Sequence, residues 1–213
     1  MVASGYNHYM ILNLNPILVV EDIPNVLALL EATLQFKGYT VITARNGQEA
    51  LDKIVEHPPI LVVTDILMPI MNGYTLAYTL KKNPLTRSIP IIFVSATFIT
   101  PEDKKFAHQV GGARFLEKPI DTEEFLLTVA EILTQELSTQ PRPIDDRQFY
   151  TGYRDCLQVK LEHKNAQIMR MEKVLENLPQ DQKSGFEDLL AGSIHERNQI
   201  HAEMDQVLRK LTD

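Results

Sequence analysis

Residues 16–22 read Pro16-Ile17-Leu18-Val19-Val20-Glu21-Asp22, a short apolar run that ends in two adjacent carboxylates. An apolar run of this length, bounded by a turn signal, is typical of a fully buried strand in a parallel sheet. In parallel α/β sheets, ligands bind at the carboxyl ends of the strands. Two acidic side chains placed there repel each other and lose hydration. The stretch therefore predicts an α/β sheet with a site for a divalent cation at its edge.

The next hundred residues alternate between strands and amphipathic helices. Further strands are predicted at 39–44, 60–64, 90–94 and 113–117, and helices at about 24–36, 47–57, 74–82, 101–110 and 122–137. The predicted apolar face of the first helix includes Leu29 and Phe36, and that of the second helix includes Val55. Five β-α units in this order are the signature of a doubly wound parallel sheet.

Composition and charge limit the classes of protein that remain. The chain has 213 residues, which allow one ordinary domain with an appendage or two small domains. The net charge of -7 argues against nonspecific binding to nucleic acid or to an anionic membrane. The single cysteine, Cys156, indicates a reducing compartment, and no apolar run approaches the roughly 20 residues of a membrane span. Residues 1–15 lack the features of a secretory signal and are interpreted as an N-terminal extension. A cytoplasmic protein is expected.

Five polar side chains stand at the ends of the predicted strands, namely Glu21, Asp22, Asp65, Ser95 and Lys118. The carboxyl ends of parallel strands meet at one edge of the sheet, so these groups are expected to converge. Three carboxylates suit Mg²⁺, and a lysine with a hydroxyl can help compensate the charge of a transferring phosphoryl group. Asp65 would then be a nucleophile that forms an aspartyl phosphate. Each residue alone has an ordinary structural explanation, but their joint occurrence favours this chemistry.

Residues 16–137 resemble the receiver domain of two-component response regulators. The matching residues are Glu21-Asp22, Asp65 with Met68-Pro69 and Gly73, Ser95-Ala96, and Lys118-Pro119. The resemblance covers a little over half of the chain. It implies a flavodoxin-like fold with a five-stranded parallel sheet in the order 2-1-3-4-5.

The resemblance also implies specific roles around Asp65. Asp65 would accept a phosphoryl group from a histidine of a sensor kinase. Glu21, Asp22, Asp65 and the backbone carbonyl of Leu67 would hold Mg²⁺. Leu67 and Thr97 occupy the positions that tune the lifetime of the aspartyl phosphate in this family. Because an apolar Leu67 cannot orient an attacking water by hydrogen bonding, slow autodephosphorylation is expected.

The same resemblance assigns the switch to Ser95 and Phe115, and it gives Lys118 a role in binding the phosphoryl group. Ser95 would bind one phosphoryl oxygen, and Lys118 would pair with another. Phe115 occupies the aromatic switch position, where it can turn inward behind Ser95 but offers no hydroxyl. The peptide bond between Lys118 and Pro119 is expected to be cis, which X-Pro bonds reach at small cost.

Two other functions share part of this pattern. A phosphatase of the haloacid dehalogenase type also uses an aspartate nucleophile after a strand, but it requires a second aspartate two residues further on. Leu67 occupies that place and cannot transfer a proton, so any catalysis is expected to be limited to the chain's own phosphorylation and dephosphorylation. The other alternative is a receiver scaffold that does not cycle phosphate and acts only through protein–protein interaction. The complete set of acids, serine and lysine argues against it.

The chain beyond the receiver-like region carries no strand signal. Residues 138–144 are predicted as a polar linker with two prolines, and residues 145–213 as two long antiparallel helices separated at Pro179. Ser184 and Glu187 suggest a capping box for the second helix. In that helix the residues on a heptad-like seam are Phe186, Leu190, Ile200, Met204, Val207 and Leu211, with Ser193 and Arg197 as polar members.

The helical region is predicted to bind protein rather than nucleic acid. Residues 141–213 carry 11 Lys or Arg and 13 Asp or Glu, without the basic recognition helix of a DNA-binding module. Two long helices bury little surface alone, so either homodimerisation into a four-helix bundle or docking on a downstream partner is expected. His195-Glu196 loosely resembles the pair of a phosphotransfer helix, but a solvated surface histidine is the simpler interpretation.

Overall fold

The computed structural model describes residues 15–95, 101–134 and 144–212. The chain divides into two compact units, Met1–Ile144 and Asp145–Asp213, and each is described by itself. The predictions that concern residues 1–14, Ala96, Thr97, the end of the predicted helix at 135–137 and the linker at 138–143 lie outside the described residues.

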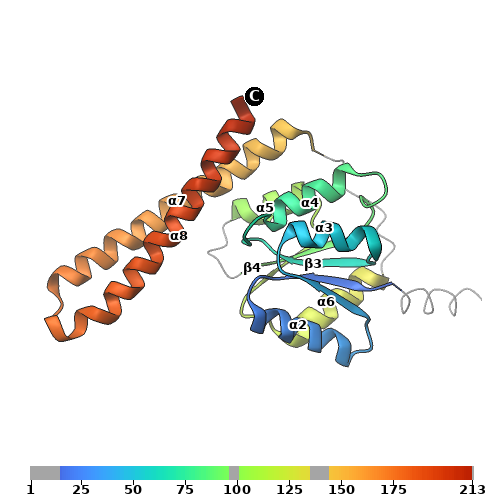
Figure 1. Ribbon diagram of the computed structural model, residues 1–213, viewed down its shortest axis with the longest axis horizontal. Helices are drawn as coiled ribbons and strands as arrows, with labels where there is room; N and C mark the ends of the chain where they lie inside the picture. The colour runs from blue at the N-terminus through green and yellow to red at the C-terminus, as the bar shows by residue number, and fades with distance from the viewer. Residues whose placement is uncertain (1–14, 96–100, 135–143, 213) are drawn as a thin grey trace, which may run out of the picture. The chain divides into compact units, whose positions relative to one another are not determined.

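The first unit is built on one parallel sheet of five strands (Figure 1). The strands are β1 (Ile17–Val20), β2 (Val41–Ala44), β3 (Leu61–Asp65), β4 (Ile91–Ser95) and β5 (Arg114–Glu117). Their order is β2-β1-β3-β4-β5, and every pairing is parallel. The predicted fold and strand order are confirmed.

Helices cover both faces of this sheet. One face carries α2 (Pro24–Phe36) and α6 (Thr122–Thr134), while the other carries α3 (Gly47–Glu56), α4 (Gly73–Lys82) and α5 (Pro101–Gln109), as Figure 1 shows. Strands β1, β3 and β4 are therefore buried on both sides, as their uninterrupted apolar runs predict. The core of α2, α6 and the sheet consists of Ile17, Val19, Leu30, Leu34, Leu61, Val63, Ile92, Val94, Leu116, Phe125, Val129 and Ile132.

Four of the predicted inward-facing side chains of α2 and α3, Ala32 among them, are exposed instead. Leu29 and Phe36 of α2 and Val55 of α3 point away from the core. In α2 the only charged residue is Glu31, so apolar residues occur nearly all round the helix and their spacing does not single out the buried face. The buried face of α2 is centred on Leu30 and Leu34.

Side-chain caps fix the helices that leave the carboxyl edge of the sheet. Asn46 caps α3 and Asn72 caps α4, and each side-chain oxygen accepts a hydrogen bond of 2.9 Å from the backbone N–H three residues further on. Asp121 caps α6 and accepts two backbone hydrogen bonds of 2.9 Å. These caps hold the loops that surround the strand ends.

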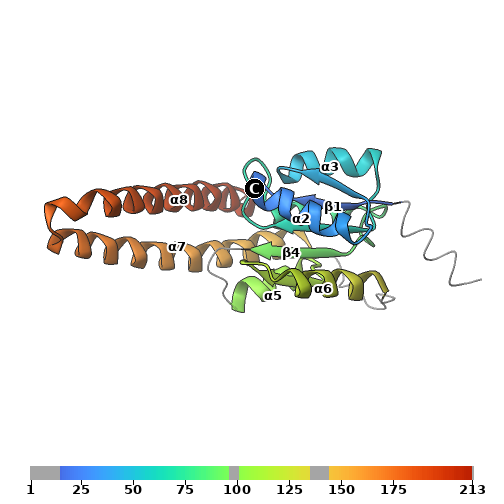
Figure 2. The same ribbon diagram turned by 90° about the horizontal axis from the view of Figure 1, so that it is seen from below.

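The second unit is a helical hairpin of α7 (Asp146–Asn177) and α8 (Gln180–Thr212), which lie side by side in Figures 1 and 2. A capping box of Asp145 and Gln148 starts α7, with hydrogen bonds of 2.7 and 3.1 Å. The prediction that Ser184 and Glu187 cap the second helix is wrong, because α8 already begins at Gln180, directly after Pro179. Proline is compatible with a helix start because it removes no intrahelical hydrogen bond there, and the carbonyl of Pro179 accepts a 3.0 Å hydrogen bond from the backbone N–H of Gln182.

The seam of the hairpin follows the predicted heptad spacing along α8 from Leu190 onward, but the prediction is wrong for Phe186, which is exposed on the turn before the buried stripe begins. The residues that are buried or half-buried at steps of three and four are Leu190, Ser193, Arg197, Ile200, Met204, Val207 and Leu211. Polar contacts also join the helices: the amine of Lys164 lies 2.6 Å from Oε2 of Glu196, and the hydroxyl of Ser193 lies 3.7 Å from the sulfur of Met171. No helix in the described part of the chain is long and apolar enough to cross a lipid bilayer.

Candidate functional site

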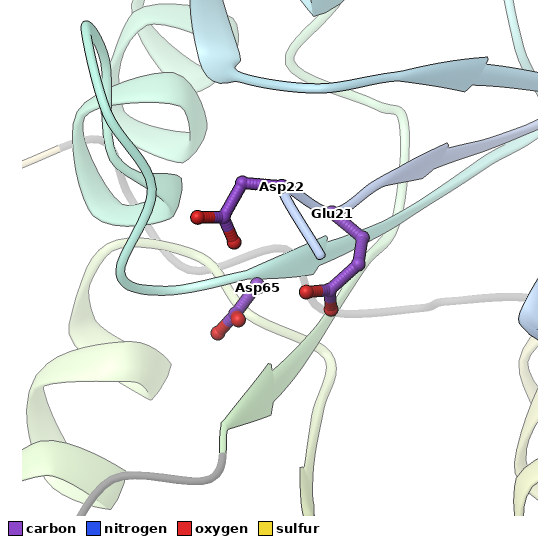
Figure 3. A group of neighbouring side chains, drawn as sticks. All are labelled: Glu21, Asp22 and Asp65. Carbon is purple, nitrogen blue, oxygen red and sulfur yellow. The ribbon is translucent and has the colours of Figure 1, made fainter. Parts of the chain in front are cut away.

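Three carboxylates gather at the carboxyl edge of the sheet. Glu21 and Asp22 directly follow β1, and Asp65 is the last residue of β3. Because Val20 pairs with Thr64 in the register of these neighbouring strands, the three acids are brought together. Each offers one oxygen, and these oxygens all lie within 4.8 Å of one another (Figure 3). We call Glu21, Asp22 and Asp65 the acidic cluster.

Lys118 reaches this cluster from β5, the edge strand of the sheet. It directly follows β5, and its backbone N–H donates a hydrogen bond of 2.8 Å to the carbonyl of Ser95. Its side-chain amine lies 2.6 Å from Oε2 of Glu21 and 2.8 Å from Oδ2 of Asp65. The peptide bond to Pro119 is cis, as expected. One ammonium group thus bridges two of the three acids.

The carboxylate of Asp65 is held in one orientation. Oδ1 accepts a hydrogen bond of 2.6 Å from the backbone N–H of Ile66, and Oδ2 accepts the hydrogen bond from Lys118. Asp65 is nearly buried. These two hydrogen bonds fix the orientation of the carboxylate.

The cluster carries more negative charge than its surroundings compensate. Burial raises the pKa of the Glu21 carboxyl, and repulsion by Asp65 adds to the effect although the hydrogen bond from Lys118 opposes it. Burial and repulsion by Asp65 likewise raise the pKa of Asp22. Burial alone would lower the pKa of Lys118, but its hydrogen bonds to Asp65 and Glu21 outweigh that effect and raise it. Three acids share one lysine, and this surplus of carboxylate oxygens fits a hard divalent cation such as Mg²⁺.

The loop after Asp65 packs too tightly to admit side chains at two glycines. A Cβ atom on Gly73 would lie 2.1 Å from the carbonyl oxygen of Asp65. A Cβ atom on Gly47 would lie 2.7 Å from Cγ of Met71, whose carbonyl accepts a 2.9 Å hydrogen bond from the Gly47 N–H. Gly73 belongs to the motif that the sequence shows, whereas the role of Gly47 depends on a contact between distant segments and carries no local signal.

The remaining predicted site residues lie on or beside the same edge. Ser95 is the last residue of β4 and is buried, and Val94 before it pairs with Asp65. Phe115 lies in β5, where it is half-buried and pairs with Phe93. Leu67 lies in the loop between β3 and α4 and is partly buried. Within residues 15–95, 101–134 and 144–212, the acidic cluster is the one group of three potential metal-ligating side chains that was found.

Comparison with known proteins identifies this arrangement. The response regulator receiver domain family matches residues 17–130, which are more than half of the chain. The chain belongs to the response regulator receiver family. Receiver domains bind Mg²⁺ at an acidic site and interact with histidine kinases or other partners, and most such regulators are not enzymes.

Individual relatives match this chain over part of its length. Response regulator Rre1 of Synechocystis sp. is 30% identical over 145 residues, which are 68% of this chain and 62% of Rre1. Protein PilH of Pseudomonas aeruginosa is 34% identical over 117 residues, which are 55% of this chain and 96% of PilH. Among solved structures, chemotaxis protein CheY4 of Vibrio cholerae matches with a TM-score of 0.53 and 29% identity, over 56% of this chain and 98% of that protein. The chain covers less than two thirds of several curated relatives, Rre1 among them.

Proposed function

We propose that this chain is a phosphoryl-accepting response regulator in which Asp65 takes the phosphoryl group from a histidine of a sensor kinase. The observation that carries the proposal is the position of Asp65 between Lys118, at 2.8 Å, and the carboxylates of Glu21 and Asp22. A nucleophilic carboxylate beside one fixed cation and a surplus of metal-ligating oxygens suits phosphoryl transfer.

The transfer itself is a displacement at phosphorus. An oxygen of Asp65 forms the new oxygen–phosphorus bond while the bond between phosphorus and the donor histidine nitrogen breaks. The electron pair of the broken bond stays on that nitrogen, and the imidazole takes up a proton. The Lys118 amine holds Asp65 in position and stays beside the transferred group, where its charge offsets that of a phosphoryl oxygen.

Mg²⁺ is the proposed cofactor of this step. Glu21, Asp22 and Asp65 would hold the ion together with the backbone carbonyl of Leu67. When bound, the ion supplies positive charge that offsets the oxygens of the transferring group. Glu21 is already oriented by Lys118 and by the backbone N–H of Ile23, which lies 3.2 Å from its Oε1.

We further propose that the modification is transmitted through Ser95 and Phe115. Ser95 would move toward the phosphoryl group and bind one of its oxygens, and Phe115 would turn into the space behind it. Phe115 is half-buried on an edge strand, so a rotation of its ring changes the surface made by α5, β5 and α6. Phosphorylation would thus shift the population between two packings of that surface.

The helical hairpin at 145–213 is proposed as the output module, with residues 138–144 as the linker. Its seam combines apolar residues with Lys164, Glu196 and Ser193, and its surface charges are mixed. These features suit a protein–protein output, either a homodimeric four-helix bundle or docking on a downstream partner, rather than DNA binding. Analytical ultracentrifugation with and without beryllofluoride and Mg²⁺ tests the coupling, since equal dimer affinity in both states would refute it.

Acetyl phosphate with and without Mg²⁺ tests phosphoryl acceptance without any kinase. We expect intact-mass spectrometry to show one added phosphoryl group on the wild type in the presence of Mg²⁺ and none on Asp65→Asn. Labelling of Asp65→Asn to the same extent would contradict the assignment. If beryllofluoride binding and labelling are both absent from the wild type, the alternative of a non-cycling receiver scaffold is supported.

A further inference from the structure

Ile70 combines two features that usually exclude each other. Its backbone φ is 68°, in the left-handed region, and its side chain is 83% exposed. Among the described residues it is the only one other than glycine with a positive φ. Asparagine, aspartate and glycine adopt this conformation readily, whereas a β-branched residue there is a genuine outlier.

The positive φ belongs to a very tight turn. The backbone N–H of Met71 donates a hydrogen bond of 2.8 Å to the carbonyl of Pro69, which spans only Ile70. A hydrogen bond of this kind around a central residue with positive φ defines the classic γ-turn, which is rare and strained. Ile70 therefore stands at the apex of a γ-turn in the loop between Asp65 and α4.

The surrounding loop prevents this turn from relaxing. The carbonyl of Met71 is fixed by the N–H of Gly47, where no Cβ atom fits. The N–H of Gly73 donates a 2.9 Å hydrogen bond to the carbonyl of Ile66 and closes the loop. Such over-determined strain persists at functional sites. Both ends of the loop contact Asp65, so Ile70 is held at a fixed place beside the acidic cluster.

Within the described residues, no contact compensates for the strain of isoleucine at this apex. The side chain is mostly in water, so it adds little to the core, and asparagine would occupy the same turn with less strain than isoleucine. A large apolar side chain held outward gains its stabilisation only when another molecule covers it. The geometry therefore points to a contact outside the chain.

We propose that Ile70 is an apolar docking contact for the histidine-bearing helix of the phosphodonor protein, and this inference rests on the function proposed above. Asp65 is nearly buried, so a donor that delivers a phosphoryl group to it must cover the loops that border the cluster. A phosphorylated donor is anionic, as is the cluster, so apolar contacts must supply docking affinity there. Ile23, which follows the acidic pair at the neighbouring strand end, is also half-exposed and apolar.

The substitution Ile70→Asn separates docking from chemistry, and Leu85→Asn is its matched control. Leu85 is 87% exposed and lies in the segment between α4 and β4. This segment leads into the amino end of β4, at the edge of the sheet opposite to the acidic cluster. Ile70→Val keeps an apolar β-branched side chain at the apex. The donors are the autophosphorylated sensor kinases encoded in the same genome, screened against the wild type so that the fastest is used for all variants.

For Ile70→Asn we expect kcat/KM of phosphotransfer from that kinase to fall about tenfold, the usual effect of losing one apolar anchor. Labelling by acetyl phosphate should stay at the wild-type rate, and the thermal midpoint should rise by about 2–4 °C because the strain is relieved. Ile70→Val and Leu85→Asn should transfer within about twofold of the wild type.

Three results would overturn the inference while leaving phosphoryl acceptance intact. They are wild-type transfer to Ile70→Asn, an equal loss in Leu85→Asn, and labelling of the wild type by acetyl phosphate but by none of the kinases. A loss of acetyl phosphate labelling in Ile70→Asn would show that the turn shapes the site instead. A change of self-association in Ile70→Asn with unchanged transfer would assign the contact to a second copy of the chain. Absence of all labelling of the wild type would instead refute the proposed function.

Discussion

The ammonium group of Lys118 lies between Asp65 and Glu21, 2.8 Å from Oδ2 of the first and 2.6 Å from Oε2 of the second. All three side chains are at most one tenth exposed. This lysine is therefore both a part of the proposed phosphoryl site and the cation that makes a buried cluster of acids tolerable in the metal-free receiver.

Replacement of that cation should be costly. We expect Lys118→Met to lower the free energy of unfolding of the metal-free protein by about 3–5 kcal/mol, because it leaves buried charges unpaired. Added Mg²⁺ should restore part of the loss, while acetyl phosphate labelling should drop sharply. Urea unfolding with and without Mg²⁺ measures both effects. Lys104→Met removes an exposed ion pair with Glu117 and should cost at most about 1 kcal/mol, so equal losses in the two variants would contradict the role given to Lys118.

Replacement of Asp22 should change the stability of the metal-free receiver in the opposite direction to replacement of Lys118. The pKa of Asp22 in the folded receiver is raised above the ordinary 3.8. At a pH between 3.8 and the folded-state pKa, the carboxyl is therefore protonated more often in the folded than in the unfolded protein. The metal-free receiver therefore loses stability as the pH rises through that window. At neutral pH, Asp22→Asn should raise the free energy of unfolding by about 0.5–1 kcal/mol, the scale of a solvent-screened charge pair. It should also abolish Mg²⁺-dependent phosphorylation while α7 and α8 stay folded by circular dichroism, and normal labelling of this variant would refute the metal site.

Two glycines provide a matched pair with opposite expectations. Gly73→Ala places a methyl group 2.1 Å from the Asp65 carbonyl, so we expect a loss of more than about 3 kcal/mol in stability or a displaced Asp65 that no longer accepts phosphate. Gly192→Ala adds the same methyl group to α8, where nothing lies within 4 Å, and should stabilise the helix by about 1 kcal/mol. Thermal unfolding of both variants tests the close packing, which would be wrong if Gly73→Ala were neutral.

Leu67 should make the aspartyl phosphate long-lived. Its side chain lies two residues beyond Asp65 and has no group that could orient an attacking water. We expect Leu67→Asn to accelerate release of inorganic phosphate about tenfold, because an amide can position that water. A phosphate-release assay on the purified aspartyl phosphate decides the matter. A wild-type half-life of seconds would contradict the expectation.

The fold and the acidic cluster were predictable because both depend on local pattern. The apolar runs at 17–20 and 60–63 are continuous, as strands buried on both faces require, and the acidic residues that follow these runs must lie at one edge of the sheet. The outward positions of Leu29 and Phe36 were not predictable, since α2 is apolar nearly all round. The start of α8 was misplaced because a proline that ends one helix can directly precede another.

Contacts between segments that are distant along the chain left no local signal at all. The γ-turn at Ile70 depends on the hydrogen bond between Gly47 and Met71, and the sequence around Ile70 shows only an ordinary loop. The hydroxyl of Tyr74 in α4 lies 3.3 Å from both the carbonyl and the carboxylate of Asp103 in α5. Helical periodicity places Tyr74 in the core but does not identify its partner.

The contact between Tyr74 and Asp103 ties α4 to the first turn of α5, the helix that follows the segment after Ser95. Tyr74 is fully buried, and its ring packs edge-on against Phe93 and Phe106 at centroid distances of 5.3 and 5.0 Å. Tyr74→Phe keeps this packing and removes only the hydroxyl, so we expect a loss of about 1 kcal/mol in urea unfolding. The variant should also bind beryllofluoride with altered affinity if α5 moves on activation. Phe36→Ser, at an exposed position, should change neither quantity, and unchanged stability of Tyr74→Phe would show that the hydroxyl contributes nothing to the position of α5.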